Sequence, residues 1–361
     1  MRVLTLNPGS SSMKVSLVAD GTAVGWTAWD LGDHSAVAPT IRRWSDVDAI
    51  AVRFVHGGAQ TAPAPVDDAL LASLEQLTPL APNHQPQSLE VTRVVRRLLP
   101  DVPVVACFDT AFYAGMPESA ARYPLPRAWT TQNRLRRCGF HGLSCQHALR
   151  RTADLLGRAP DQLQLICAHV GAGVSVTAIR DGHGVDTSMG FTPLEGAMMA
   201  TRSGSVDPGL LLHVMQTVPM SPAEMADALF HRSGLAGMSG TNGDLRQVLT
   251  AAARREPDAE VALDVYRHRL RREIGAAAAS LSRLDAVVFT GGVAEHQPEV
   301  ITAVLDGLGV LGLRAGDVPR TDVDRIVTAA DSPVPALIVL PREDLELARG
   351  AEDALARLAV T

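Results

Sequence analysis

The sequence predicts an α/β protein built from two duplicated domains, and three observations support this class. First, 361 residues is long for a single hydrophobic core, so two domains are expected. Second, short apolar runs typical of buried strands alternate with segments whose apolar residues recur every three or four positions, as in helices. Third, a hairpin pattern with a polar tip occurs at residues 1–18 and again at 164–182, about 160 residues later.

The first hairpin has two apolar arms, residues 3–6 and 15–18, around a polar tip. The tip residues are Asn7, Gly9, Ser10, Ser11, Ser12 and Lys14. They offer many hydrogen-bond donors and one positive charge to an anion such as phosphate, although the same residue types also form ordinary solvated turns. The second copy carries Gly171, Gly173 and Ser175, and both copies end in Asp-Gly. If two related domains face each other, both tips lie at one cleft, which suits a nucleotide.

Further elements follow in order along the chain. Residues 102–108 form a buried-strand pattern, and the apolar positions from Leu263 to Leu281 predict one amphipathic helix. A short strand at 286–290 leads through Gly291-Gly292 into a helix, which is either an anion contact or a plain turn between strand and helix. A strand at 336–340 and a helix at 343–359 close the chain.

Composition excludes several classes of function. The net charge is −6 and there is no basic run, which argues against nucleic acid or an anionic membrane as partner. No signal peptide or membrane span is recognisable at the N-terminus, and no G-x-x-x-x-G-K-[ST] motif occurs. The four cysteines do not form C-x-x-C, so reduced thiols and a cytoplasmic location are expected.

Several loops concentrate residues suited to anion chemistry. Arg53 follows a strand and precedes Gly57-Gly58, so it suits either a forked anion contact or a structural ion pair. His84 lies in a polar loop, and His141 stands between two glycines. Each is, taken alone, more often a structural histidine than a catalyst. The richest stretch is 190–208, where Arg202 lies among hydroxyls and turn residues.

Taken together, these parts resemble the acetate kinase family, within the superfamily of actin-like, sugar-kinase and Hsp70-like ATPases. The resemblance covers nearly the whole chain, and its motifs occur in family order. They are 7–14 (NPGSSSMK), 53–58 (RFVHGG), 81–86 (APNHQP), 108–112 (FDTAF), 139–142 (GFHG), 187–196 (TSMGFTPLEG), 201–208 (TRSGSVDP), 288–292 (VFTGG) and 341–344 (PRED).

The resemblance implies reversible transfer of the ATP γ-phosphoryl group to a short-chain carboxylate such as acetate or propionate, giving acyl phosphate and ADP. It implies two duplicated ribonuclease-H-like domains with an active-site cleft between them, and a cleft that excludes water when it closes. The expected domains are 1–113 with 342–361, on the acyl and phosphate side, and 114–341, for nucleotide binding and dimerisation. Mg²⁺ or Mn²⁺ is the expected metal, and a homodimer the expected assembly.

Residue roles also follow from the resemblance. The expected catalytic residues are Arg53, Asp109, His141 and Arg202. The expected substrate-binding residues are Arg53, Val55, Asn83, His84, Phe140 and Pro193. The expected nucleotide-binding residues are Asn7, Ser10, Ser12, Lys14, His169, Gly171, Gly173, Asp244, Leu245, Arg246, Gly292 and Val293. Asn7 and Glu343 are expected at the metal, with Asp344 as the alternative to Glu343 and Asp109 as a further carboxylate that organises the ion.

The chain departs from the family pattern at several positions. Ala172 replaces an asparagine in the second hairpin and His296 replaces an asparagine in the late glycine turn, which leaves the phosphoryl donor open. Asn83 replaces a leucine, so either the substrate carries a polar group or Asn83 turns to solvent. The chain is also compact near residues 30–50. Two other functions compete: a non-catalytic nucleotide-binding regulator, and a sugar or polyol kinase that would need a carboxylate base.

Overall fold

The computed structural model describes residues 1–9, 12–30 and 36–360, and it divides them into two compact units. Unit 1 contains 1–115, 138–147 and 341–361, and unit 2 contains 116–137 and 148–340. The segment 138–147 therefore groups with the first unit, although the sequence analysis places it in the second domain. The hydroxyl of Tyr113, which donates to the carbonyl oxygen of Phe140 at 2.7 Å, is one bond that holds it there.

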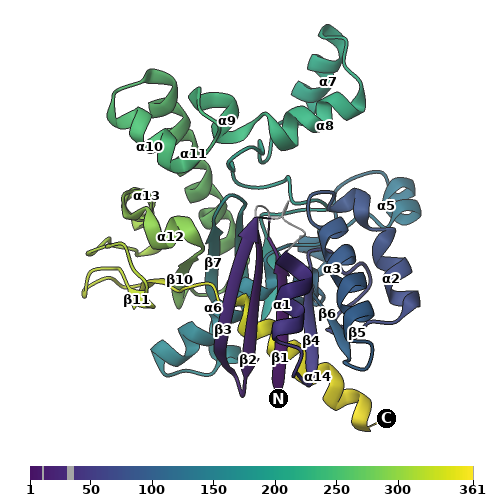
Figure 1. The fold of residues 1–361 in the computed structure, drawn as a ribbon. Helices are drawn as coiled ribbons and strands as arrows, with labels where there is room; N and C mark the ends of the chain where they lie inside the picture. Colours follow the sequence, from purple (N-terminus) through teal and green to yellow (C-terminus); the bar gives the residue numbers. More distant parts are fainter. Residues whose placement is uncertain (10–11, 31–35, 361) are drawn as a thin grey trace. The chain divides into compact units, whose positions relative to one another are not determined.

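Unit 1 is a six-stranded sheet with helices on both faces (Figure 1). Its strand order is β3-β2-β1-β4-β6-β5. The strands are β1 (Arg2–Pro8), β2 (Ser12–Ala19), β3 (Thr22–Asp30), β4 (Ala49–Phe54), β5 (Ala64–Pro65) and β6 (Val104–Phe108). Its helices are α1 (Val37–Arg43), α2 (Asp68–Glu75), α3 (Gln85–Leu98) and α14 (Glu343–Val360), and α6 (Gly142–Leu156) begins here and continues into unit 2.

The two faces of this sheet have separate cores because successive strand residues point to opposite sides. Leu4 and Leu6 of β1 pack on the side of α2 and α3. Val3 packs on the other side, against Leu347, Ala348 and Ala351 of α14. The yellow α14 helix in Figure 1 covers this second face, so the C-terminal segment belongs to the same core as the first strand.

Unit 2 has the same sheet topology. Its order is β11-β12-β10-β7-β8-β9, in which β7, β8 and β9 form an antiparallel meander and β10 and β12 run parallel to β7. The strands are β7 (Leu165–Val170), β8 (Val174–Arg180), β9 (His183–Thr187), β10 (Ala286–Thr290), β11 (Arg325–Ile326) and β12 (Ala336–Ile338). The helices are α4 (Glu118–Ala121), α5 (Arg127–Asn133), α7 (Pro208–Thr217), α8 (Pro222–His231), α9 (Gly234–Ser239), α10 (Leu245–Ala253), α11 (Pro257–Ala278), α12 (Gly292–His296) and α13 (Pro298–Asp306).

The duplication extends to local irregularities. In unit 1 Asn7 pairs with Lys14 across the hairpin, and in unit 2 His169 pairs with Ser175. Counted from Lys14 and from Ser175, the pairing of the second strand with the third (β2 with β3, β8 with β9) shifts register three to four residues later, between Leu17 and Val18 and between Ala178 and Ile179. Six residues after the same starting points, Asp20 and Asp181 both adopt a positive φ, of 47° and 53°. Two domains of one design are therefore confirmed.

The helix and strand predictions agree with the structure except at their ends. The strand at 286–290 is confirmed at both ends, and the predicted strand at 102–108 begins two residues later. The predicted 263–281 helix begins at Pro257, because proline at the first helical position starts a helix without losing a hydrogen bond. The helix after Gly291-Gly292 is two helices, α12 and α13, which meet at Gln297.

Candidate active site

Arg53 and Asp109 form a buried, forked ion pair at one edge of the unit 1 sheet. Arg53 lies near the carboxyl end of β4, where it pairs with Cys107 of β6, and Asp109 directly follows β6. The Arg53 Nη2 donates to Asp109 Oδ2 at 2.7 Å, and its Nε lies 3.2 Å and 3.3 Å from the two carboxylate oxygens. Because the two strands are parallel neighbours, their carboxyl ends bring these side chains together.

The other side of the Arg53 guanidinium binds Asn7 and Glu343. Its Nη1 donates to Asn7 Oδ1 at 3.0 Å and lies 3.4 Å from Glu343 Oε2. The amide of Asn7 in turn donates to Glu343 Oε2, at the first residue of α14. Asp344, one residue on, pairs instead with Arg342 at 2.9 Å. Four residues predicted for the site thus meet here, and Glu343 is the carboxylate that joins them.

The charges in this cluster depend on one another. Burial by itself lowers the pKa of Arg53, but the carboxylates of Asp109 and Glu343 outweigh it and raise that pKa above its ordinary value. Burial raises the pKa of Asp109, and the guanidinium of Arg53 works against that rise. The cluster therefore keeps a permanent cation between two carboxylates in a site with little water.

His141 is held beside this cluster in an unusual backbone conformation. Its φ is +59°, a left-handed backbone conformation that residues other than glycine rarely adopt. Such conformations are often found at functional sites. The next residue must be glycine, because a Cβ on Gly142 would lie 1.9 Å from the carbonyl oxygen of Asp109. The start of α6 therefore packs directly on the backbone of Asp109, which brings the predicted catalytic histidine next to the predicted carboxylate.

Two of the predicted acyl-binding residues of unit 1 are buried near a second histidine, His56. Val55 and Phe140 are almost fully buried, and the His56 ring lies edge-on to Phe140 with 5.9 Å between ring centres. Burial lowers the pKa of His56 to about 4, so it is neutral at physiological pH. Its Nδ1 accepts a hydrogen bond from the Gly58 amide at 3.0 Å, which assigns the proton to Nε2. His84 is half-buried at the start of α3.

Asn83 has an exposed side chain in the structure. An exposed amide is open to solvent and need not shape an acyl pocket. We therefore expect Asn83→Leu to leave the order of kcat/KM across acetate, propionate and glycolate unchanged. Steady-state rates on the three acids test this expectation, and a reordering that demotes glycolate would contradict it.

Unit 2 contributes Arg202, a guanidinium without an acidic partner among the described residues. Its Nη1 donates to the carbonyl oxygen of Pro193 at 2.9 Å and to Met199 Sδ at 3.6 Å. Burial lowers the pKa of Arg202 to about 10, so it remains a cation at neutral pH. A carbonyl oxygen and a thioether are neutral acceptors, so they offset little of the cost of burying the Arg202 charge. An anionic ligand would offset it.

The residues predicted for the nucleotide occupy loop and helix-start positions. In unit 2, His169 is the last residue but one of β7, and Gly171 and Gly173 lie in the β7–β8 turn, where the Gly171 amide donates to the Gly173 carbonyl at 3.0 Å. Asp244 caps α10 and forms a forked pair with Arg246, while Leu245 is buried. Gly292 and Val293 begin α12. In unit 1, Ser12 is half-buried and Lys14 exposed on β2, and Ser10 lies outside the described residues.

Comparison with known proteins identifies the family. The Acetokinase family model matches residues 31–349. The chain belongs to this family. Among curated relatives, the acetate kinase of Streptomyces avermitilis is 41% identical over 389 aligned residues, covering 96% of each chain. Among solved structures, Porphyromonas gingivalis acetate kinase has a TM-score of 0.88 at 30% identity, and a propionate kinase from Francisella tularensis has 0.88 at 28%. Each alignment covers 98% of this chain and 99% of the other.

Family membership confirms two predictions of the sequence analysis. The chain is a phosphotransferase of the acetate kinase type, whose acceptor is a carboxyl group, and its fold is that of the two-domain, actin-like kinases. The regulator and the polyol kinase are therefore not favoured. The region 190–208, which the sequence analysis marks as rich in site chemistry, contains no helix or strand before Pro208, where α7 begins.

Three polar residues near this region were not predicted for the site: Tyr123, Arg137 and Glu195. They hydrogen-bond to one another and to the backbone of the loop that precedes Arg202. Glu195 lies inside a family motif, but nothing in the sequence indicates its own role. The glycines on either side of it, Gly190 and Gly196, could have indicated that this loop is tightly packed.

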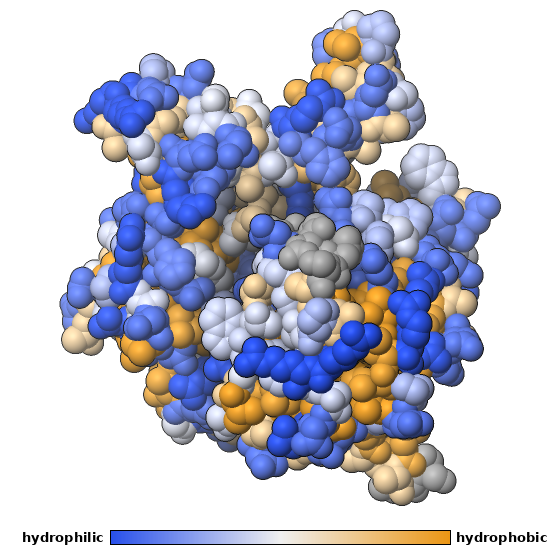
Figure 2. All heavy atoms as spheres, viewed as in Figure 1, coloured by the Kyte–Doolittle hydropathy of each residue, from blue (hydrophilic) through white to orange (hydrophobic). Residues whose placement is uncertain are grey.

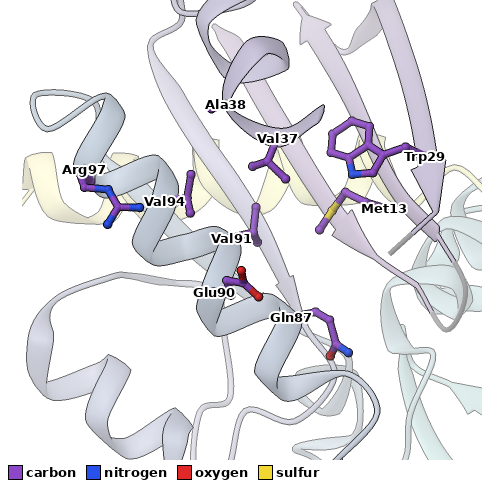
Figure 3. Close-up of a pocket in the computed structure, with 9 residues that line it drawn as sticks. All are labelled: Met13, Trp29, Val37, Ala38, Gln87, Glu90, Val91, Val94 and Arg97. Atoms are coloured by element: carbon purple, nitrogen blue, oxygen red, sulfur yellow. The ribbon is translucent and has the colours of Figure 1, made fainter. Parts of the chain in front are cut away.

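Figure 3 shows a pocket of about 210 Å³ on the α3 side of the unit 1 sheet. Met13 and Trp29 of the sheet lie across it from Val91 and Val94 of α3. None of the residues that line it is among the predicted site residues. The pocket is therefore separate from the cluster of Arg53, Asn7, Asp109 and Glu343.

Proposed function

We propose that this protein transfers the γ-phosphoryl group of ATP reversibly to a short-chain carboxylate such as acetate or propionate, forming an acyl phosphate and ADP. The observation that carries the proposal is Arg202, a half-buried cation that has no carboxylate partner among the described residues. In a carboxylate kinase such a cation has two anionic ligands to bind, the acceptor and the transferring phosphoryl group.

The chemistry requires charge more than basicity. A carboxylate is already ionised at pH 7, so it attacks phosphorus without a general base, and the barrier comes from bringing one anion to another. Arg202 supplies positive charge at the acceptor and the phosphoryl group. The Arg53 cluster has one guanidinium and two carboxylates, so it would add positive charge there only with a metal ion bound. His141 donates a hydrogen bond to a phosphoryl oxygen as negative charge spreads over it.

Mg²⁺ is the proposed metal. It prefers oxygen ligands and keeps several of its waters, so a pair of carboxylates is a sufficient protein contribution. Asp109 and Glu343 provide that pair, whereas Asn7 donates to Glu343 and accepts from Arg53 and thus orients the carboxylate. Among the described residues, no larger cluster of His, Cys, Asp and Glu gathers as a metal site. When bound, the ion neutralises phosphate charge.

The nucleotide is proposed to bind through the two hairpin tips and the loops of unit 2. Asn7, Ser12 and Lys14 would contact phosphates from unit 1. His169 and the turn at Gly171–Gly173 would contact them from unit 2, with Asp244, Leu245, Arg246, Gly292 and Val293 at the nucleoside. Ala172 offers no side-chain amide there, so backbone donors supply those contacts, and ATP affinity is expected to be modest.

Hydroxylamine trapping tests the proposed reaction. The protein is incubated with MgATP, hydroxylamine and a panel of acids, and hydroxamates are measured against ADP release. Acetate or propionate should give hydroxamate in step with ADP, because hydroxylamine captures the acyl phosphate. ADP released with polyols and without hydroxamate would contradict the proposal.

A homodimer is the proposed assembly, and α7 is the proposed contact. No residue of this ten-residue helix is buried, although Leu210, Leu212 and Met215 are apolar and well exposed. Figure 2 shows such apolar side chains, in orange, on the segment at upper right that carries α7. An apolar helix of this kind is typical of a surface covered by a second copy of the chain.

Leu212→Glu should therefore convert the protein from a dimer to a monomer of 38.2 kDa. A carboxylate at an apolar contact would be desolvated without a partner, which costs several kcal/mol of association. Light scattering after size exclusion measures the mass. Val310→Glu is the matched control, since Val310 is 92% exposed and lies outside α7. A wild type that is already monomeric, or a dimeric Leu212→Glu, would disprove this interface.

The cytoplasm is the proposed location. No helix among the described residues is long and apolar enough to cross a membrane. The four cysteines are all free thiols, three of them buried and Cys138 half-buried. Free thiols and an ATP-dependent reaction both suit a reducing compartment that contains nucleotide.

A further inference from the structure

Tyr123, Arg137 and Glu195 fasten the loop of residues 188–196 in unit 2. Arg137 Nη2 donates to Glu195 Oε1 at 2.7 Å near the end of the loop, and its Nη1 donates to the carbonyl oxygens of Thr187 and Ser188 at 3.1 Å and 3.3 Å near the start. One guanidinium therefore binds both ends of the loop. We call these three residues the loop clamp.

Tyr123 holds the middle of the same loop. Its hydroxyl accepts from the Phe191 amide at 2.8 Å and donates to Glu195 Oε2 at 2.5 Å. Burial and the Glu195 carboxylate raise the pKa of Tyr123, so the hydroxyl stays protonated and can donate. Arg137 also stacks over the Tyr123 ring, with its Cζ 5.4 Å from the ring centre.

The loop is built to fit this clamp. A Cβ at position 190 would lie 1.8 Å from Glu195 Oε2 and 2.1 Å from the Tyr123 hydroxyl, so only glycine leaves room for both groups. The far end of the loop is tied down as well, because Gly196 exchanges hydrogen bonds with Ser205 at 3.0 Å and 2.8 Å.

What the loop presents is the carbonyl of Pro193, the one oxygen that accepts from Arg202 in the described structure. We propose that Tyr123, with Arg137 and Glu195, is a positioning residue for the phosphoryl-transfer reaction, acting through Pro193 on the orientation of Arg202. The inference rests on the proposed function, because the loop clamp can affect catalysis only if Arg202 binds an anionic substrate. A guanidinium displaced by about 1 Å is expected to lose much of its effect on the transition state.

The variant Tyr123→Phe keeps the ring and removes only the hydroxyl. We expect kcat/KM for the carboxylate to fall about tenfold to a hundredfold. Thermal stability should fall modestly, because the Phe191 amide and Glu195 Oε2 each lose a hydrogen-bond partner. Tyr266→Phe is the matched control, since Tyr266 is a buried tyrosine on α11 of the same unit and outside the clamp, and it should retain full activity.

A double variant distinguishes positioning from a merely structural role. In an Arg202→Ala background, Tyr123→Phe should change kcat/KM by less than about twofold, because the group it orients is gone. Multiplicative losses in the double variant, or full activity in Tyr123→Phe alone, would overturn the inference.

A readout without activity separates this inference from the proposed function. Phenylglyoxal modifies accessible guanidiniums, and peptide mass spectrometry gives the rate at each arginine. Arg202 should react severalfold faster in Tyr123→Phe than in the wild type, while the exposed Arg254 reacts equally in both. Equal rates at Arg202 would overturn the clamp even if carboxylate kinase activity is found. A wild type that forms no acyl phosphate would instead refute the proposed function.

Discussion

Arg202→Ala should lower kcat/KM for the carboxylate by about three orders of magnitude while leaving the free energy of unfolding unchanged or slightly increased. One to two charge-assisted hydrogen bonds to the transition state, at about 1.5–3 kcal/mol each, account for the loss of activity. Stability is spared because burial depresses the pKa of Arg202, so its charge costs folding energy at neutral pH.

Steady-state kinetics and urea unfolding measure the two effects. Arg254→Ala is the control, because Arg254 is an exposed arginine of the same unit and outside the predicted site. It should change neither quantity. Near-normal turnover of Arg202→Ala would remove this residue from the proposed reaction, and a large loss of stability would show that its role is structural.

Arg53→Met should behave differently, with loss of both activity and stability. The methionine retains much of the side-chain volume, but the carboxylates of Asp109 and Glu343 lose the cation between them. Breaking a buried ion pair by removing one partner costs about 3–5 kcal/mol. Activity should fall by about two to three orders of magnitude as the charge at the phosphoryl site disappears.

The pH dependence of the Arg53→Met defect follows from Asp109. Without the guanidinium, burial raises the pKa of this carboxyl in the folded state above its unfolded value. The folded variant then binds more protons than the unfolded chain, so its stability falls as pH rises through that interval. The difference in free energy of unfolding between wild type and Arg53→Met, measured by urea unfolding, should therefore become smaller from pH 8 to pH 5.

Arg93→Met is the control for both Arg53 experiments. Arg93 pairs with Glu75 on the surface at 3.0 Å, with both side chains about half exposed. Such pairs contribute less than about 1 kcal/mol, so activity, stability and pH dependence should stay near wild type. A stability gap for Arg53→Met that widens at low pH would contradict the assigned ion pair.

The sequence was sufficient to predict where the strands that position the Arg53 cluster end. Arg53 and Asp109 each follow a continuous apolar run, and parallel buried strands are the segments that such runs predict. The two hairpins were recognisable for a similar reason, since their arms are apolar and their tips are rich in glycine and serine. The equivalent register shifts after Leu17 and Ala178, where β2 pairs with β3 and β8 with β9, required coordinates, because register is a property of strand pairing.

Other features were beyond the sequence for physical reasons. Glu343 and Asp344 are adjacent, and only the direction of α14 decides which one reaches Arg53, since neighbours on a helix point about 100° apart. The loop clamp joins Tyr123, Arg137 and Glu195 from segments up to 72 residues apart, so no local spacing reveals it. Helix α7 is apolar without a buried residue, a pattern that in sequence resembles a core helix.

The central claim, that the γ-phosphoryl group of ATP is transferred to a carboxylate oxygen, is tested by ³¹P NMR with ¹⁸O-labelled acetate or propionate and MgATP. The acyl phosphate signal should appear together with ADP, and its phosphorus should show the isotope shift of one bonded ¹⁸O donated by the acid. ADP and unlabelled inorganic phosphate, formed without any phosphorus bonded to ¹⁸O, would contradict phosphoryl transfer to the carboxylate.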